Sequence, residues 1–247
     1  MTRPVFVVPV DVLRDAREGS RLRLDGPEGR HAAAVRRIGA GDEIDLVDGA
    51  GGRATSEVTA ASHDGLDVTV LELTQEPEPQ PRLVLVQALA KGDRDEQAIE
   101  AGTELGVDAI IPWQAQRSIV QWRGERGRRS HGKWTDRVRS AAKQSRRARF
   151  PEVELLVDLK ALVRRVQEAT DAYVLHEEAT DPLAGVDLPA SGEVLVVVGP
   201  EGGITPEELT ALKEAGAQTV RLGHTVLRSS SAGPAALAVL SARSRWG

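Results

Sequence analysis

The sequence predicts an α/β fold, with a small all-β domain at the N-terminus and a larger domain of alternating strands and helices after it. Three observations predict this fold. Short segments of alternating apolar residues fill the first 73 positions, alternate prolines interrupt the pattern in 74-TQEPEPQPR-82, and from Leu83 onward apolar runs alternate with amphipathic stretches. Strand–helix alternation with short connections is typical of a mostly parallel sheet that is covered on both faces.

Residues 1–73 contain short strand-like segments that glycine and aspartate separate. The alternation is clearest in 66-LDVTVLEL-73, where one face of the predicted strand is apolar. Several short strands at this spacing indicate a small barrel or sandwich, to which residues 31–38 add one helical turn. The predicted strands lie at 5–10, 20–24, 42–49, 54–62 and 65–73.

The alternate prolines of 74–82, with acidic residues among them, predict a stiff, extended linker. The larger domain is then expected to span residues 83–247. Its predicted strands lie at 83–89, 107–112, 172–176, 194–198 and 218–222. Its predicted helices lie at 93–106, 130–148, 158–169, 205–215 and from about Ser231 onward.

Composition narrows the class of protein. The chain has no cysteine, which excludes disulfides and thiolate metal sites and favours the reducing cytoplasm. No apolar run approaches the roughly 20 residues that a membrane span needs. His31, His176 and His224 are not spaced as a metal site, so we expect no metal.

The net charge is −5, but the charges are distributed unevenly along the chain. From Arg117 to Arg149 there are 12 basic residues and two acidic ones, a net charge of +10, which leaves −15 for the rest of the chain. Trp134 and Val138 belong to an apolar stripe at helical spacing that should pack. The alternative is a solvated helix face, but such a face usually mixes charges of both signs. The segment therefore predicts contact with RNA phosphates.

The stretch 195-LVVVGPEGGITPEE-208 joins a predicted buried strand to a helix through a glycine-rich turn. Thr205 and Glu208 match a capping box, and Pro206 suits the first helical position. The glycine spacing fits neither GxGxxG nor GxxxxGK[ST], and Glu201 would repel a phosphate. A glutamate among backbone N–H groups suits a ligand with hydroxyls and positive charge, such as a ribose and a sulfonium. The alternative is a solvated side chain in an ordinary loop.

A second glycine turn, in 220-VRLGHTVLRSSSAGPAAL-237, should lie at the same edge of the sheet. Together with 31-HAAAVRRIGAGDEIDLVDG-49 and 87-QALAKGDRDEQAIEAGTELGV-107, the two turns resemble the 16S rRNA uridine-N3 methyltransferases of the SPOUT (trefoil-knot) superfamily. The resemblance spans nearly the whole chain. Further matches, on and around the family's basic helix, are 117-RS-118, Gln144, Arg147 and Pro151.

The resemblance implies S-adenosylmethionine as methyl donor and uracil N3 in the 16S rRNA of the small ribosomal subunit as acceptor. It also implies a PUA-like RNA-binding barrel over residues 1–73, a SPOUT-type trefoil-knot methyltransferase domain over 83–247, and a cytoplasmic homodimer. The family often has arginine at the position of Thr225, glutamate at that of Ser230 and an acid at that of Lys143. Catalysis is therefore not assigned to those side chains.

Two residues are candidates for catalysis. Arg228 could stabilise the uracil anion that forms as the N3 proton leaves, the alternative being an ion pair that fixes the loop. Glu201 could hold ribose hydroxyls, orient the donor or serve as base, and we favour binding. The residues expected to bind the cofactor are His176, Val198, Gly199, Pro200, Glu201, Gly202, Gly203, Leu222, Gly223, Val226, Leu227, Arg228 and Ser230. Those expected to bind RNA are Arg36, Arg37, Arg117, Lys143, Gln144, Arg146, Arg147 and Arg149.

Three other functions fit parts of the sequence. A non-catalytic rRNA-binding assembly factor of the same build would have no affinity for S-adenosylmethionine. Another SPOUT methyltransferase would act on tRNA or on a different rRNA site. A nucleotide-dependent oxidoreductase is disfavoured because GxGxxG is missing.

Overall fold

The computed structural model describes residues 3–246, which form two compact units. The N-terminal unit consists of residues up to Glu78 together with the separate segment Ala142–Phe150. The C-terminal unit consists of Pro79–Ala141 and the chain from Pro151 onward. The second segment of the N-terminal unit overlaps the C-terminal end of the predicted helix 130–148 and interrupts the other unit, so neither unit is one continuous piece of chain.

The N-terminal unit is built on a five-stranded sheet of order β1-β3-β4-β5-β2. The strand β1 runs parallel to β3, and every other pair is antiparallel. Its core contains Phe6, Leu24 and Leu46, all almost fully buried. The strands are β1 (Val5–Val7), β2 (Arg21–Leu24), β3 (Glu43–Val47), β4 (Gly52–Ser62) and β5 (Gly65–Gln75). The helices are α1 (Val10–Arg14), α2 (Gly26–Arg30) and the π-helix η1 (His31–Val35).

The segment 142–150 packs on the β1 edge of this sheet. Ala148 and Phe150 form a small apolar cluster with Val5, Val7 and Val47. The backbone of the segment also pairs with the loop after β3, since the Phe150 N–H donates to the carbonyl oxygen of Gly49 at 2.9 Å. Backbone and apolar contacts therefore hold the segment to the N-terminal unit.

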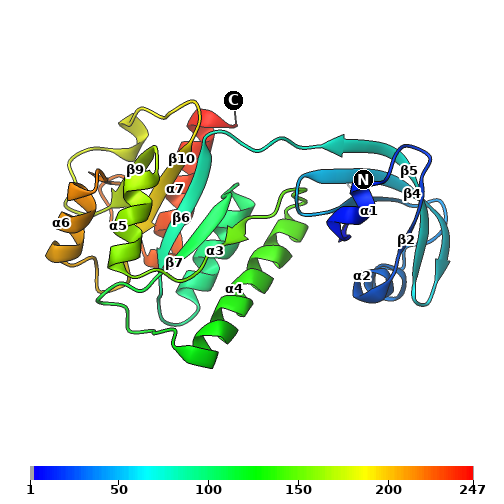
Figure 1. The fold of residues 1–247 in the computed structure, drawn as a ribbon, viewed down its shortest axis with the longest axis horizontal. Coiled ribbons are helices and arrows are strands. Elements are labelled where there is room, and N and C mark those ends of the chain that lie inside the picture. Colours follow the sequence, from blue (N-terminus) through cyan, green and yellow to red (C-terminus); the bar gives the residue numbers. More distant parts are fainter. Residues whose placement is uncertain (1–2, 247) are drawn as a thin grey trace. The chain divides into compact units, whose positions relative to one another are not determined.

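The C-terminal unit is a parallel six-stranded sheet of order β11-β9-β10-β6-β7-β8 (Figure 1). The strands are β6 (Arg82–Ala88), β7 (Ala109–Trp113), β8 (Glu152–Val153), β9 (Asp171–Leu175), β10 (Glu193–Val198) and β11 (Gln218–Val220). The helices are α3 (Arg94–Glu104), α4 (Gly124–Gln144), α5 (Leu159–Glu168), the short 3-10 helix η2 (Leu183–Gly185), α6 (Pro206–Glu214) and α7 (Ser229–Ser244).

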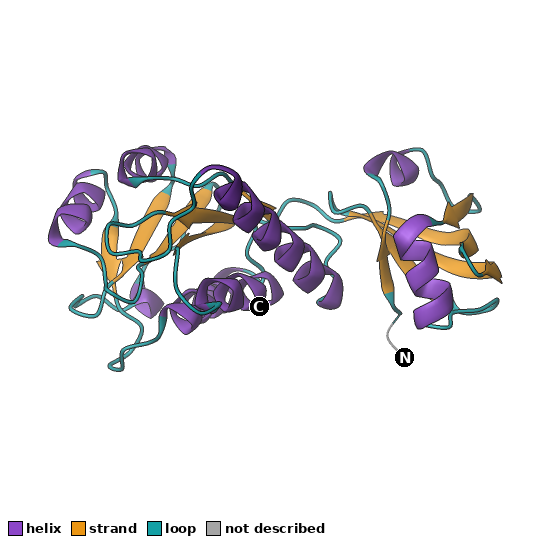
Figure 2. Ribbon diagram, turned by 90° about the horizontal axis from the view of Figure 1, so that it is seen from below, coloured by secondary structure: helices purple, strands orange, loops and turns teal. Residues whose placement is uncertain are grey.

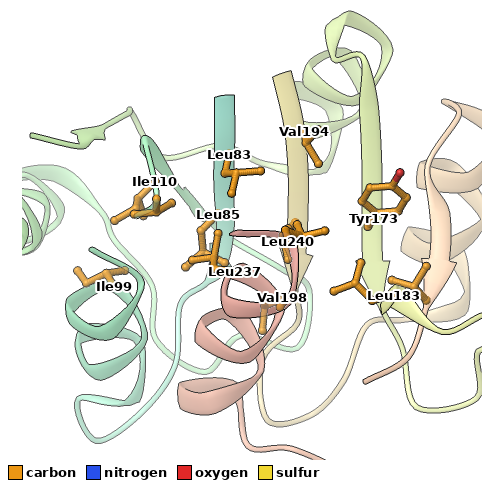
Figure 3. Packing of buried hydrophobic residues seen from close by; sticks show 14 of the residues in the cluster. Leu83, Leu85, Ile99, Ile110, Tyr173, Leu183, Val194, Val198, Leu237 and Leu240 are labelled. Atoms are coloured by element: carbon orange, nitrogen blue, oxygen red, sulfur yellow. The ribbon is translucent and has the colours of Figure 1, made fainter. Parts of the chain in front are cut away.

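Helices cover both faces of this sheet (Figure 2). Alternate residues of β6 and β10 enter two separate cores, because side chains alternate along a strand. Leu83, Leu85 and Val196 face the core that α3, α4 and α7 complete, and part of this core is drawn in Figure 3. Val84 and Val197 face the core that α5 and α6 complete. The predicted parallel sheet with two covered faces is confirmed.

Several element boundaries differ from the prediction. The predicted strand 5–10 ends at Val7, because Pro9 provides the N-cap of α1. The predicted linker 74–82 is shorter, since β5 runs to Gln75 and β6 begins at Arg82. Strand β8, with only two residues, is too short to leave a pattern in the sequence. Among residues 3–246, no helix combines the length and hydrophobicity that a membrane crossing requires.

Helix α4 starts at Gly124 and ends at Gln144, whereas the prediction was 130–148. It ends because Arg146 adopts a left-handed conformation, with φ of 60°. The Arg147 N–H then donates to the carbonyl of Ala142, and the Arg146 N–H donates to that of Lys143. This is a Schellman motif, which usually has glycine at the left-handed position. The predicted apolar stripe consists of Trp134, Val138, Ala141, Ala142 and Ser145. It is confirmed for the first four, which are buried, whereas Ser145 is half-buried.

Candidate active site and RNA-contacting residues

A cavity of about 790 Å³ lies in the C-terminal unit, where β9, β10 and β11 end. The carboxyl edge of a parallel sheet is the usual place for a ligand in such folds. Of the residues predicted to bind the cofactor, all except Ser230 line this cavity. The two glycine turns, far apart in the sequence, are therefore brought together as walls of one pocket.

The first wall is the turn 199–203 between β10 and α6. The Gly203 N–H donates to the Pro200 carbonyl at 2.9 Å, and Gly203 has a φ of +75°, a conformation that favours glycine. The predicted capping box of α6 is present, with Thr205 and Glu208 each accepting from the other's backbone N–H. A side chain at Gly202 would meet Arg117, since an added Cβ would lie 3.1 Å from the Arg117 Cβ.

The carboxylate of Glu201 ties this turn to the loop that follows β6. Its Oε1 accepts from the Lys91 N–H and from the Arg94 guanidinium, each at 3.0 Å. Neither bond uses Oε2. Partial burial acts to raise the pKa of Glu201, but the hydrogen bonds from its own backbone amide, from Lys91 and from Arg94 outweigh it and lower the pKa below the usual value. Glu201 is thus an ionised acceptor, which makes it a weak base.

The second wall is the loop 221–228 between β11 and α7. The backbone at Gly223 has a φ of +70°. Val226 is 75% exposed, so the loop presents an apolar side chain at the mouth of the pocket. The guanidinium of Arg228 is exposed, lines the pocket and forms no ion pair or side-chain hydrogen bond with any residue from 3 to 246. The Oγ of Ser229, which also lines the pocket, is buried and has no partner within that range.

His176 follows β9 and contributes to a third side of the pocket. Its Nδ1 accepts from the Glu178 N–H at 3.2 Å, which orients the ring. Within the described part of the chain, no group of three or more histidine or acidic side chains is placed to hold a metal ion. His176 is therefore available to a ligand of the pocket through its other ring nitrogen.

The predicted RNA-binding residues fall into two sets. Arg117 belongs to the C-terminal unit and lines the cavity between the two glycine turns, where its guanidinium donates to the Gly202 carbonyl at 2.8 Å. The other seven belong to the N-terminal unit. Of these, Arg36, Arg37, Gln144 and Arg146 are exposed.

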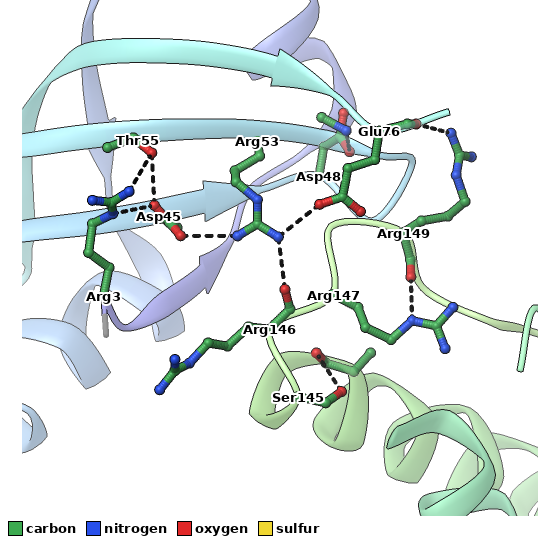
Figure 4. Close-up of polar contacts among 12 residues, drawn as sticks. Arg3, Asp45, Asp48, Arg53, Thr55, Glu76, Ser145, Arg146, Arg147 and Arg149 are labelled. Carbon is green, nitrogen blue, oxygen red and sulfur yellow. Dashed lines mark hydrogen bonds and ion pairs between the residues drawn. The ribbon is translucent and has the colours of Figure 1, made fainter. Parts of the chain in front are cut away.

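Three of the predicted RNA-binding residues are engaged within the N-terminal unit. Lys143 forms an ion pair with Glu28 at 2.7 Å and lies over the ring of Phe6. Arg149 donates to the Glu76 carbonyl at 2.9 Å, and Arg147 donates to the Arg149 carbonyl at 3.0 Å (Figure 4). Part of the positive charge thus stabilises the position of 142–150.

Arg146 combines an exposed side chain with a fixed backbone. Its carbonyl accepts from the Arg53 guanidinium at 2.8 Å, and Arg53 is itself paired with Asp45 and Glu76 (Figure 4). A non-glycine residue in the left-handed region costs about 1–2 kcal/mol. The sequence keeps an arginine here despite that cost, which supports a role for its side chain in binding.

We expect Arg146→Gly and Arg146→Ala to separate these two effects. Both variants lose the guanidinium, so both should bind RNA more weakly than the wild type. The glycine variant should be more stable than the alanine variant by roughly 1 kcal/mol in urea unfolding, because only glycine adopts a φ of 60° without strain. Equal stability of the two variants, or RNA affinity that follows stability, would contradict this expectation.

The sequence did not point to every residue of the pocket. Arg94 was missed because its partner Glu201 is 107 positions away. Leu175 and Glu177 could have been found, since they flank His176 at the end of a predicted strand, where the ligand edge lies.

Comparison with known proteins identifies the class. An RNA methyltransferase domain model matches residues 76–241, and an RNA methyltransferase PUA domain model matches residues 24–71. The fold and the glycine-walled pocket thus define an RNA methyltransferase with a parallel α/β domain at the C-terminus and a PUA domain at the N-terminus, which confirms the predicted α/β fold class, while the trefoil knot stays a prediction.

The particular family follows from whole-chain relatives. Ribosomal RNA small subunit methyltransferase E of Mycobacterium tuberculosis is 46% identical over 242 residues, covering 96% of this chain and 92% of its own length. The protein of that name from Bacillus subtilis is 32% identical and covers 91% of each. The chain belongs to the ribosomal RNA small subunit methyltransferase E family.

One solved relative has a similar fold and contains a bound ligand. The ribosomal RNA small subunit methyltransferase E from Neisseria gonorrhoeae, crystallised bound to S-adenosylmethionine, is 26% identical, has a TM-score of 0.85 and covers 98% of each chain. The predictions of an rRNA methyltransferase and of S-adenosylmethionine as its cofactor are confirmed at the level of the family.

Proposed function

We propose that this protein transfers the methyl group of S-adenosylmethionine to N3 of a specific uridine in the 16S rRNA of the small ribosomal subunit. It does so in the cytoplasm as a homodimer. One observation carries the proposal: the guanidinium of Arg228, which has no partner among residues 3–246, lines the same pocket as the two glycine turns and the carboxylate of Glu201.

The residues of the pocket suit S-adenosylmethionine. Its volume of about 790 Å³ lies within the range of small-molecule sites. Val198, Leu222 and Ile204 offer apolar surface, and the glycine turns offer backbone groups. The Oε2 of Glu201 could accept from a ribose hydroxyl. The Oγ of Ser229, which has no partner in the described part of the chain, is a further polar group for the ligand. When bound, S-adenosylmethionine supplies a methyl group activated by a sulfonium.

The residues of this chain contribute to the reaction by aligning the reactants and by stabilising the negative charge that forms on the uracil. Uracil N3 carries a weakly acidic proton, and loss of this proton to solvent puts negative charge on the flanking carbonyl oxygens. A guanidinium at Arg228 would stabilise that charge. Glu201 is ionised and paired with Arg94, so we assign it to donor binding and not to proton abstraction. Positioning then supplies much of the rate, because methyl transfer needs an aligned nucleophile and little covalent help.

Each unit carries exposed cations that suit the phosphates of the RNA. In the N-terminal unit the exposed arginines Arg36, Arg37 and Arg146 are suited to phosphates. In the C-terminal unit Arg117 borders the donor pocket itself. This position supports a contact between Arg117 and RNA close to the target base.

The test is to map methylation in rRNA. Small subunits from a strain that lacks the corresponding gene are incubated with the protein and labelled S-adenosylmethionine. A methyl group on N3 blocks the pairing edge of uracil, so reverse transcription should stop next to one uridine of 16S rRNA. Label on tRNA or on another rRNA site would indicate a different methyltransferase. Binding to the subunit without label, and without affinity for S-adenosylmethionine, would indicate an assembly factor.

Two exposed apolar side chains support the proposed homodimer. Val226 and Leu227 are exposed at the mouth of the pocket, where a second copy could cover them. We expect light scattering at micromolar concentration to give twice the chain mass of 26.5 kDa. A fully active monomer would contradict the dimer and leave the methyl transfer as proposed.

A further inference from the structure

A second groove lies in the C-terminal unit, separate from the donor pocket. It has a volume of about 480 Å³, and its walls come from the loop after β7 and the first turns of α5. The residues that matter here are Gln121, Trp122, Arg123, Asp158, Lys160 and Arg164. Arg123 belongs to the basic segment that was predicted to contact RNA, whereas Asp158, Lys160 and Arg164 lie outside it and were not predicted as part of a site.

The groove is cationic. Arg123, Lys160 and Arg164 are exposed, and none of the three forms an ion pair or side-chain hydrogen bond with any other residue from 3 to 246. The acid in the groove is Asp158, whose Oδ1 accepts from the Ala161 N–H at 2.8 Å and so caps α5. Within residues 3–246 the groove thus carries three cations without a partner and one acid, Asp158, whose carboxylate already caps α5. This excess of positive charge favours an anionic ligand.

The groove also has a fixed aromatic wall. The ring of Trp122 is half-buried and meets Trp134 edge-on, with 5.0 Å between the ring centroids. Its backbone N–H donates to Gln114, and the Gln114 amide donates to the Val120 carbonyl, so the loop around Trp122 is held on both sides. A rigid aromatic next to free cations suits a ligand that carries both phosphates and a flat ring.

One loop joins the groove to the donor pocket. Arg117 lines the pocket and bonds to the Gly202 carbonyl, while Arg123, six positions later, lines the groove. Six residues span at most roughly 20 Å. An RNA strand in the groove would therefore reach the donor pocket within a few nucleotides.

We propose that this groove binds single-stranded RNA that flanks the target nucleotide, with its phosphates on Arg123, Lys160 and Arg164 and a base or ribose against Trp122. This inference rests on the proposed function, because it assigns the groove to the same RNA substrate. It adds a contact region that the basic segment does not include, since Lys160 and Arg164 lie on α5.

The test combines charge reversal with a matched control. Lys160→Glu with Arg164→Glu should weaken binding to unmethylated small subunits on the order of tenfold, and should flatten the plot of log K against log salt by roughly 0.7 per lost contact. The single variant Lys160→Glu is measured as well, and Lys213→Glu is its control because it makes the same exchange of charge elsewhere. Lys213 is also an exposed helical lysine but lines neither cavity, so its substitution should leave both RNA affinity and slope unchanged.

A second measurement does not depend on activity. Binding of a short single-stranded 16S rRNA fragment should quench tryptophan fluorescence in the wild type, and Trp122→Phe should remove most of the quench while preserving an aromatic ring. Wild-type RNA affinity and salt slope in the Lys160→Glu, Arg164→Glu variant would overturn the inference. A change in the oligomeric mass of that variant in solution would also overturn the inference, because the groove would then be a contact between subunits.

The two proposals fail in different ways. A wild-type protein that binds the RNA fragment but transfers no methyl group would overturn the proposed function. A wild-type protein that methylates 16S rRNA normally, together with unaltered RNA binding of the charge-reversed variant, would overturn the groove alone.

Discussion

Replacement of Arg228 by alanine should lower the turnover number for rRNA methylation by roughly 10²–10³. The guanidinium lines the donor pocket and has no partner within residues 3–246, so its removal breaks no internal ion pair. Affinity for S-adenosylmethionine should change little, because the glycine turns and Glu201 remain. Single-turnover methylation of saturating small subunits gives the rate, and calorimetry gives the affinity for the donor.

Two controls make the role of Arg228 specific. Arg228→Lys keeps the charge but loses the planar, two-pronged donor, so it should recover only part of the rate. In Arg228→Ala the reaction relies on unassisted loss of the N3 proton, so its rate should rise more steeply with pH than that of the wild type. A parallel loss of donor affinity in both variants would instead mean that Arg228 belongs to the donor site.

Glu201→Gln should weaken binding of S-adenosylmethionine roughly 10- to 100-fold, the usual effect of losing a hydrogen bond to a charged group. At saturating donor its turnover should stay within a few-fold of the wild type. Folding stability should fall by less than about 1 kcal/mol, because Arg94 is 44% exposed and an ion pair so open to water contributes little. Titration calorimetry and urea unfolding measure the two effects separately.

The pH dependence distinguishes binding from base catalysis at Glu201. Its pKa in the folded protein is lowered, so the charged form persists at neutral pH, and its contribution is lost only as the pH falls through that lowered pKa. Donor affinity should therefore show no step from Glu201 between about pH 8 and pH 5, since an ordinary glutamate titrates near 4.3. A rate step near neutrality that vanishes in Glu201→Gln would identify it as the base.

Much of the donor pocket could be predicted because its signals are local. The capping box at Thr205 and the buried strand before Gly199 are written within a few consecutive residues. The ion pair between Glu201 and Arg94 could not be predicted, since it joins residues 107 positions apart. Nor could the groove at Trp122, because its cations come from two segments that only the fold brings together.

The basic segment from Arg117 to Arg149 was predicted to have one role, RNA contact. In the structure its residues are divided between the two units, and only some of them stay exposed. Its charge pattern indicates an exposed surface but does not indicate which arginines fold back on their own unit. Arg149 and Lys143 are held by Glu76 and Glu28, which are distant in sequence. Arg146 stays exposed because the left-handed turn after α4 directs the backbone, and not the guanidinium, toward Arg53. Such choices depend on tertiary contacts.

The division of the N-terminal unit into two pieces of chain limits how this protein can be taken apart. A fragment that ends at Glu78 would lack Ala148 and Phe150, and so would leave Val5 and Val47 without their apolar cover. A graft of this unit onto another methyltransferase would have to carry 142–150 as well, at a matching point of the host. Recombination in evolution faces the same restriction. An exchange that transfers both pieces of chain together is expected to preserve the N-terminal unit. A single crossover near residue 78 transfers only one piece and is expected to disrupt it.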